Sequence, residues 1–263
     1  MMPLVENRLS RTKVTGLPLT IFVTTALYFV WLYLSSALDF DRHGIINDFD
    51  FVTTQFFLQN RTPARLQIFT FITAFGSWSI VVALAIAVSA LLWLNGRQQY
   101  LMTLWLVLAG NQISVTLIKV IFARSRPELA YYSEASYSFP SGHSAVSAAF
   151  FGFVFYIILK ERILPAGLSV ASAFLVMVLI GTSRLVLGEH YVSDVLHGYL
   201  VGALWLLLGT WVQGHAISVA ERQPIIESFK LNVFAHLSVI VIGAASIWIL
   251  VMFYVASLNI LTF

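Results

Sequence analysis

The chain has 263 residues, of which 59% are hydrophobic and only 10% are charged, and its mean hydropathy is +0.86. Soluble domains carry about 25% charged residues, so this composition excludes a water-soluble globule and predicts a protein whose main solvent is lipid. The net charge of +3 without a basic run argues against nucleic acid as a partner, and the absence of cysteine excludes disulfides, thiolate catalysis and cysteine-ligated metals.

Seven apolar runs are candidate membrane spans, each of which needs about 20 residues, and the fourth is short unless its helix begins inside the preceding loop. In chain order they cover roughly 17–38, 68–94, 100–122, 144–159, 163–186, 191–212 and 233–258. We therefore predict an all-α, polytopic transmembrane helical bundle. Its parts are a cytoplasmic segment (1–16), a six-span core (17–213), and a cytoplasmic linker with an additional span (214–263).

Residues 39–66, between the first two runs, mix acidic residues with aromatic and aliphatic ones. This pattern favours an amphipathic helix that lies on the membrane surface. A metal-binding loop is the alternative, but the spacing of Asp39, Asp41, Asp48 and Asp50 fits no calcium-loop pattern. We predict no metal site in the chain.

Lys and Arg in short loops predict the orientation. Arg8, Arg11 and Lys13 precede the first run, and the basic excess stays on their side once the residues assigned below to a site are set aside. We therefore expect a cytoplasmic N-terminus, with the loops 39–66 and 123–143 on the outer face.

The remaining polar residues of interest gather at four span ends that share this outer face, because consecutive spans alternate in direction. Ionisable residues in membrane segments are costly and usually mark function. Three segments distant in sequence should thus form one pocket. They are Lys119 with Arg126, the run Pro140-Ser141-Gly142-His143, and Arg184 with His190 and Asp194.

This set of residues suits phosphoryl transfer. Three fixed cations match a phosphate whose transition state spreads charge over three oxygens, and a Ser-Gly step before a helix offers backbone N–H groups to an anion. His190 and Asp194 stand four apart, so the carboxylate can orient the ring and leave its other nitrogen free to attack phosphorus. His143 can then protonate the leaving alkoxide.

The order and spacing of these residues resemble the three-part signature of the type 2 phosphatidic acid phosphatase superfamily, which includes lipid phosphatases, soluble acid phosphatases and vanadium haloperoxidases. The match runs through Lys119-x6-Arg126-Pro127, Pro140-Ser141-Gly142-His143 and Ser183-Arg184-x5-His190-x3-Asp194 without a departure. We expect no cofactor, and the resemblance implies a six-span core. It also implies His190 as nucleophile, Asp194 as its partner, His143 as acid, and phosphate binding by Lys119, Arg126, Ser141, Gly142 and Arg184.

Five further residues lie near the motifs. Gly198 and Gly202 form a small-xxx-small pair that favours close helix packing. His197 is expected to pack in the interior or to support Asp194. Arg124 and Glu189 either touch a lipid head group or are solvated charges at the rim.

We expect a membrane phosphatase that acts on a lipid phosphate or pyrophosphate among the membrane lipids. Phosphatidic acid, phosphatidylglycerol phosphate, a polyprenyl pyrophosphate and a glycolipid phosphate stay open, because the motifs recognise phosphate and indicate neither its carrier nor an oligomeric state. Lipid-to-lipid phosphotransfer at the same site is the alternative, and an anion transporter is a further one. The multi-span setting resembles the bacterial branch of the family and implies a bacterial plasma (inner) membrane, with the site on the outer or periplasmic side.

Overall fold

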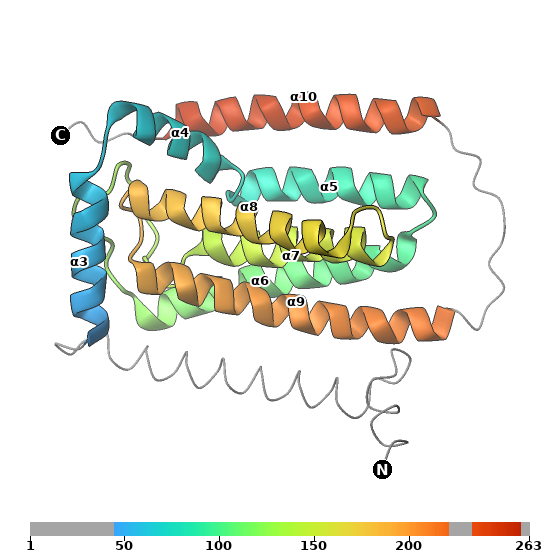
Figure 1. Cartoon of the computed structure of the whole chain (residues 1–263), viewed down its shortest axis with the longest axis horizontal. Coiled ribbons are helices and arrows are strands. Elements are labelled where there is room, and N and C mark those ends of the chain that lie inside the picture. The colour runs from blue at the N-terminus through green and yellow to red at the C-terminus, as the bar shows by residue number, and fades with distance from the viewer. Residues whose placement is uncertain (1–44, 221–232, 259–263) are drawn as a thin grey trace, which may run out of the picture.

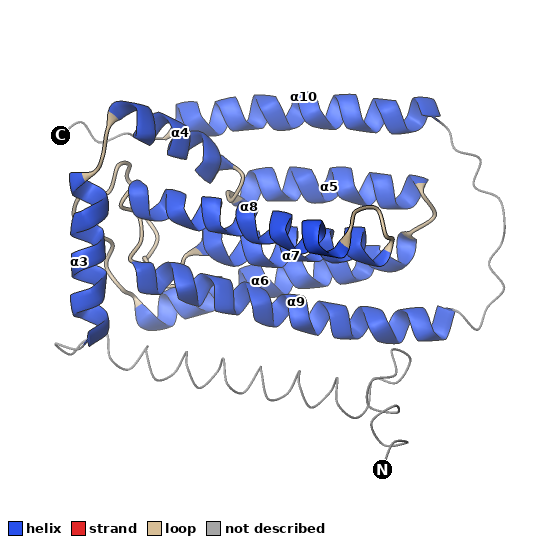
Figure 2. Cartoon of the chain, viewed as in Figure 1, coloured by secondary structure: helices blue, strands red, loops and turns tan. Residues whose placement is uncertain are grey.

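The computed structural model describes residues 45–220 and 233–258, and every regular element in these ranges is helical, as Figure 2 shows. The predicted segment 1–16, the predicted span 17–38 and residues 221–232 of the predicted linker lie outside the described residues. The helices in Figure 1 are α3 (Ile45–Gln59), α4 (Pro63–Ala74), α5 (Trp78–Leu94), α6 (Leu101–Phe122), α7 (Gly142–Lys160), α8 (Ala166–Val186), α9 (Val192–Ala220) and α10 (Val233–Ser257), with a short 3-10 helix, η1 (Gln98–Tyr100), before α6.

Five of these helices are long and apolar enough to cross a membrane, and α4 with α5 forms one further candidate span. Large apolar side chains remain exposed on their outer surfaces: Ile113 on α6 is 60% exposed, Phe174 on α8 67% and Phe253 on α10 71%. Such surfaces are stable in lipid and not in water. The predicted all-α, polytopic membrane bundle is confirmed.

The second predicted span is interrupted, so the expectation of one continuous helix over 68–94 is wrong. Between α4 and α5 the chain bends by 48°, at a turn that contains Gly76. A side chain at Gly76 would have its Cβ 2.7 Å from Ile180 Cγ2 and 3.0 Å from His143 Cδ2. The bend therefore brings the backbone of Gly76 close to α8 and to the N-terminus of α7. Hydropathy alone does not reveal this contact.

Helix α3 lies across one end of the bundle (Figure 1). It exposes Phe49, Phe51, Val52 and Phe56 and buries Asp50. Apolar residues that face outward at a bundle end suit the headgroup region of a bilayer. The helix predicted within 39–66 is present, and in the described part of that segment Asp50 is paired with Arg124.

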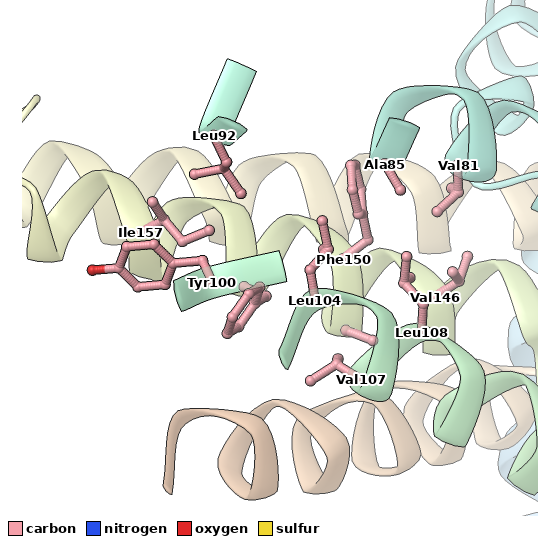
Figure 3. Close-up of a cluster of buried hydrophobic side chains, with 12 residues drawn as sticks. Val81, Ala85, Leu92, Tyr100, Leu104, Val107, Leu108, Val146, Phe150 and Ile157 are labelled. Carbon is pink, nitrogen blue, oxygen red and sulfur yellow. The ribbon is translucent and has the colours of Figure 1, made fainter. Parts of the chain in front are cut away.

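Helix α7 lies at the centre of the bundle and packs against α5, α6, α8 and α9. A Cβ on Gly198 would lie 2.4 Å from the Ser141 carbonyl oxygen, and one on Gly202 would lie 2.2 Å from that of Ala145. The predicted close packing is thus confirmed, and it holds the N-termini of α7 and α9 together. The apolar core between α5, α6 and α7, drawn in Figure 3, includes Val81, Ala85, Leu104, Leu108, Val146, Phe150 and Phe153.

Candidate active site

A cavity of about 470 Å³ opens at the end of the bundle that α3 crosses. Five of the eight predicted site residues line it: Lys119, Arg126, Gly142, His143 and His190. The other three, Ser141, Arg184 and Asp194, are fully buried, and each contacts or adjoins a residue of the lining. The structure therefore brings the three sequence segments together.

His190 lies just before α9, and Asp194 lies in the first turn of that helix. His190 Nδ1 is 3.4 Å from Asp194 Oδ2, and the same oxygen accepts a hydrogen bond of 3.0 Å from the Tyr191 amide. The other ring nitrogen, Nε2, is 3.4 Å from Arg126 Nη1. One nitrogen thus faces the carboxylate and the other faces a cation of the cavity.

The protonation of His190 follows from this setting. Burial, reinforced by the guanidinium groups of Arg126 and Arg184, lowers the pKa of His190 well below its ordinary value. The ring is therefore neutral at physiological pH. A neutral ring whose Nδ1–H points at a carboxylate carries its lone pair on Nε2, which is the form that a nucleophile needs.

Two of the cations share one carboxylate, Glu134, which the sequence motifs did not single out. Arg184 Nη2 lies 2.9 Å from Glu134 Oε1, and Arg126 Nη2 contacts Oε2. Burial opposes ionisation of Glu134, but Arg184 and Arg126 outweigh it and lower the pKa of the carboxyl to about 2. Glu134 thus places two anionic oxygens where the oxygens of a phosphate would meet both arginines.

The three cations are held by several parts of the chain. Arg184 donates 2.9 Å to the Thr73 hydroxyl on α4 and contacts the Tyr132 hydroxyl. Arg126 Nε donates 2.8 Å to the Ser136 carbonyl, and Lys119 Nζ contacts the Tyr137 carbonyl. The loop between α6 and α7 therefore fixes the cationic side of the cavity.

The start of α7 is built from the second motif. Ser141 caps the helix: its hydroxyl oxygen accepts from the Ser144 amide at 3.4 Å and from the Ser144 hydroxyl at 3.0 Å. The Ser141 amide donates 3.0 Å to the Asp194 carbonyl. The Ser141 amide thus joins the start of α7 to α9, its hydroxyl caps α7, and Gly142 and His143 line the cavity.

The Glu189 side chain is buried, and the Arg124 side chain is 13% exposed and paired with two carboxylates. The solvated-rim interpretation of both residues is therefore wrong. Glu189 Oε1 accepts 3.1 Å from the Tyr132 amide, and Arg124 Nη1 lies 2.6 Å from Asp194 Oδ1. His197 is 6% exposed, with Nδ1 2.7 Å from the Ser193 carbonyl, which confirms interior packing.

Two further contacts come from helices outside the motif region. Asp50 on α3 binds Arg124 at 2.8 Å, and the Tyr254 hydroxyl on α10 lies 3.3 Å from His143 Nε2. Neither residue belongs to a short motif. In the sequence, Asp50 stands out only as an acidic residue among aromatic ones. Tyr254 stands out only as a lone tyrosine near the end of an apolar span.

The fold and the site define a polytopic integral membrane protein with a cation-lined cavity beside a histidine–aspartate pair. The PAP2 superfamily model matches residues 100–217, which contain all three motifs. A curated relative, phosphatidylglycerophosphatase B of Bacillus subtilis (strain 168), is 30% identical over 154 residues, which make up 56% of this chain and 75% of the relative. The chain therefore belongs to the PAP2 superfamily, as the motifs implied.

Solved structures agree with this assignment. A crystal structure from Bacillus subtilis, described as the first transmembrane PAP2 type phosphatidylglycerolphosphate phosphatase, is 25% identical with a TM-score of 0.63 and covers 78% of this chain and 98% of that one. Aquifex aeolicus LpxE is 23% identical with a TM-score of 0.51, covering 60% of this chain and 92% of that one, and shows the shared fold alone. Helix α10 lies outside the residues that the family model matches.

Proposed function

We propose that this protein hydrolyses the phosphate ester or pyrophosphate of a membrane lipid through a phosphohistidine intermediate. The observation that supports the proposal is the meeting of a neutral, carboxylate-oriented His190, a second histidine and three cations at one cavity. Phosphate-monoester hydrolysis is among the slowest uncatalysed reactions. It therefore needs positioning, charge stabilisation and protonation of the leaving group together.

In the proposed first step, the substrate phosphate displaces Glu134 and binds Lys119, Arg126 and Arg184. His190 Nε2 attacks phosphorus, the bond from phosphorus to the lipid oxygen breaks, and His143, which enters this step protonated, gives one proton to that oxygen and becomes neutral. In the second step water attacks the phosphohistidine, His143 takes a proton from the water, and the phosphorus–nitrogen bond breaks. Inorganic phosphate leaves and both histidines return to their starting states. General acid–base help of this kind contributes about 10²–10⁴-fold.

We propose phosphatidylglycerol phosphate as the first lipid to assay, because the relative that is 30% identical is named for that chemistry. Phosphatidic acid, a polyprenyl pyrophosphate and a glycolipid phosphate complete the panel. Stoichiometric release of inorganic phosphate without a lipid acceptor would exclude obligatory phosphotransfer. Purified protein that releases phosphate from no member of the panel would overturn the hydrolase proposal and favour anion transport.

We further propose that the reaction uses no metal and takes place at the outer face of a bacterial plasma membrane. The cavity lies at the same end of the bundle as α3, whose exposed phenylalanines suit a membrane surface. Activity should survive dialysis against EDTA. Activity that EDTA removes and a divalent ion restores would contradict the metal-free mechanism.

The nucleophile is tested by His190→Ala. We expect rapid quenching of the wild type to trap an alkali-stable, acid-labile phosphoenzyme, and we expect His190→Ala to lose both this species and turnover. Membrane insertion and thermal unfolding should stay close to those of the wild type, because the substitution leaves the packing of α7 against α9 intact. Near-normal phosphate release by this variant would refute the assignment.

A further inference from the structure

Asp50 differs from its neighbours on α3 in its exposure. Phe49 and Phe51, on either side of it, are 53% and 64% exposed, whereas Asp50 is 1% exposed. A buried carboxylate is strongly destabilising unless charged or hydrogen-bonding groups compensate it. Its burial at a surface helix therefore reflects specific partners.

The partners of Asp50 are the start of α9 and one arginine. Oδ1 accepts 3.0 Å from the Ser193 amide, while Oδ2 contacts the Ser193 hydroxyl and lies 2.8 Å from Arg124 Nη2. Ser193 directly precedes Asp194. An anion at a helix N-terminus is favourable, so α3 holds in place the turn that carries Asp194.

Arg124 divides its guanidinium between two carboxylates. Nη2 binds Asp50, and Nη1 lies 2.6 Å from Asp194 Oδ1 and 2.8 Å from the Ser193 hydroxyl. The guanidinium carbon lies 4.1 Å from the centre of the Tyr191 ring, which restricts its plane. Asp194 Oδ2 faces His190 and also accepts from the Tyr191 amide.

We infer that Asp50, acting through Arg124, is a positioning residue that sets how Asp194 faces His190. An arginine with both Nη atoms available binds a carboxylate through two parallel hydrogen bonds. Asp50 occupies Nη2 and so restricts Arg124 to Oδ1, which keeps Oδ2 for the His190 ring. Helix α3 is thereby a part of the active site, although it lies outside the residues that the family model matches.

The inference rests on the proposed function and is tested with Asp50→Asn, with the exposed Asp48→Asn on the same helix as the matched control. An asparagine keeps the acceptor for the Ser193 amide but no longer binds Arg124 as an anion. We expect kcat to fall by at least about tenfold, with KM within about twofold because the cations that meet the phosphate are unchanged. Asp48→Asn should match the wild type. A wild-type kcat for Asp50→Asn in an enzyme that is itself active would overturn the inference and leave the proposed function standing.

Substitutions of Arg124 separate positioning from a role in folding. If Asp50 acts through Arg124, adding Asp50→Asn to Arg124→Met should change kcat by less than about twofold, since the link is already broken. If the double variant instead loses kcat by the product of the two separate losses, Asp50 acts by capping α9 and the inference is overturned. Arg124→Lys covers the case in which Asp50→Asn does not insert into the membrane. The compact lysine ammonium lacks the planar fork whose two nitrogens bind Asp50 and Asp194 separately. We expect the same selective loss of kcat, and unchanged kcat would likewise overturn the inference.

Discussion

The Tyr254 hydroxyl lies 3.3 Å from His143 Nε2, although 111 positions separate the two residues. Tyr254 stands near the end of α10, which packs against α5 and α4. It also lines a cavity of about 450 Å³ with His143, Glu134 and Tyr132. The last span thus brings a hydroxyl to the residue that we propose as general acid.

This contact predicts that Tyr254→Phe weakens leaving-group protonation. An alkoxide leaving group needs a proton in the transition state, whereas nitrophenolate needs little. We expect kcat/KM for a lipid phosphate to fall about tenfold and kcat/KM for p-nitrophenyl phosphate to change by less than about twofold. Tyr156→Phe on α7, whose ring lies by Lys160, serves as the control. Equal losses for both substrates would mean that the hydroxyl supports the fold and not the proton transfer.

The position of Glu134 between Arg126 and Arg184 predicts that its carboxylate competes with phosphate for these two arginines. Because its pKa falls to about 2, the carboxylate remains ionised throughout the working pH range and is not released by mild acid. Glu134→Gln removes that charge from between Arg126 and Arg184. We expect vanadate, a phosphate mimic, to inhibit this variant with a Ki about tenfold lower, equivalent to about 1.4 kcal/mol. The exposed Glu128→Gln in the same loop is the control, and an unchanged or higher Ki for Glu134→Gln would contradict the prediction.

The lowered pKa of His190 predicts the acid side of the pH profile. Protonation removes the attacking lone pair, so a nucleophile with a lowered pKa stays active as the pH falls from 7 to 6. In this range any loss of kcat/KM should follow the second ionisation of the substrate, which is near pH 6 for a phosphate ester. The pH profiles of kcat/KM measured with an alkyl phosphate and with a nitrophenyl phosphate should therefore differ on the acid side. Identical acid limbs at or above pH 6.5 would show that His190 titrates there.

The absence of cysteine allows a direct test of orientation. Glu128→Cys lies in an exposed loop beside the site, and Asn95→Cys lies between α5 and α6 at the opposite end of the bundle. In intact cells a membrane-impermeant maleimide should label only Glu128→Cys, and lysis should expose both. Labelling of Asn95→Cys alone would place the site on the cytoplasmic side.

Several features could be predicted from the sequence because they depend on local pattern. Apolar runs of bilayer length located α6, α7, α8, α9 and α10 within a few residues at most ends, and motif spacing placed His190 and Asp194 on one turn. The break between α4 and α5 could not be predicted, because the apolar pattern continues through Phe75 and the close approach of Gly76 to Ile180 on α8 is visible only in the tertiary structure. The extension of α9 to Ala220, beyond the predicted end at 212, is a further difference.

Composition and motif order by themselves determined the membrane setting, the family and the identity of the central residues, since each follows from residue type and short-range spacing. The tertiary structure decided which charges neutralise one another. It placed Glu134 between Arg126 and Arg184, and it divided Arg124 between Asp50 and Asp194. It also brought Tyr254 to His143. These pairings join residues 8 to 111 positions apart, and most of them form only when separate helices pack at one end of the bundle, where burial makes each unpaired charge costly.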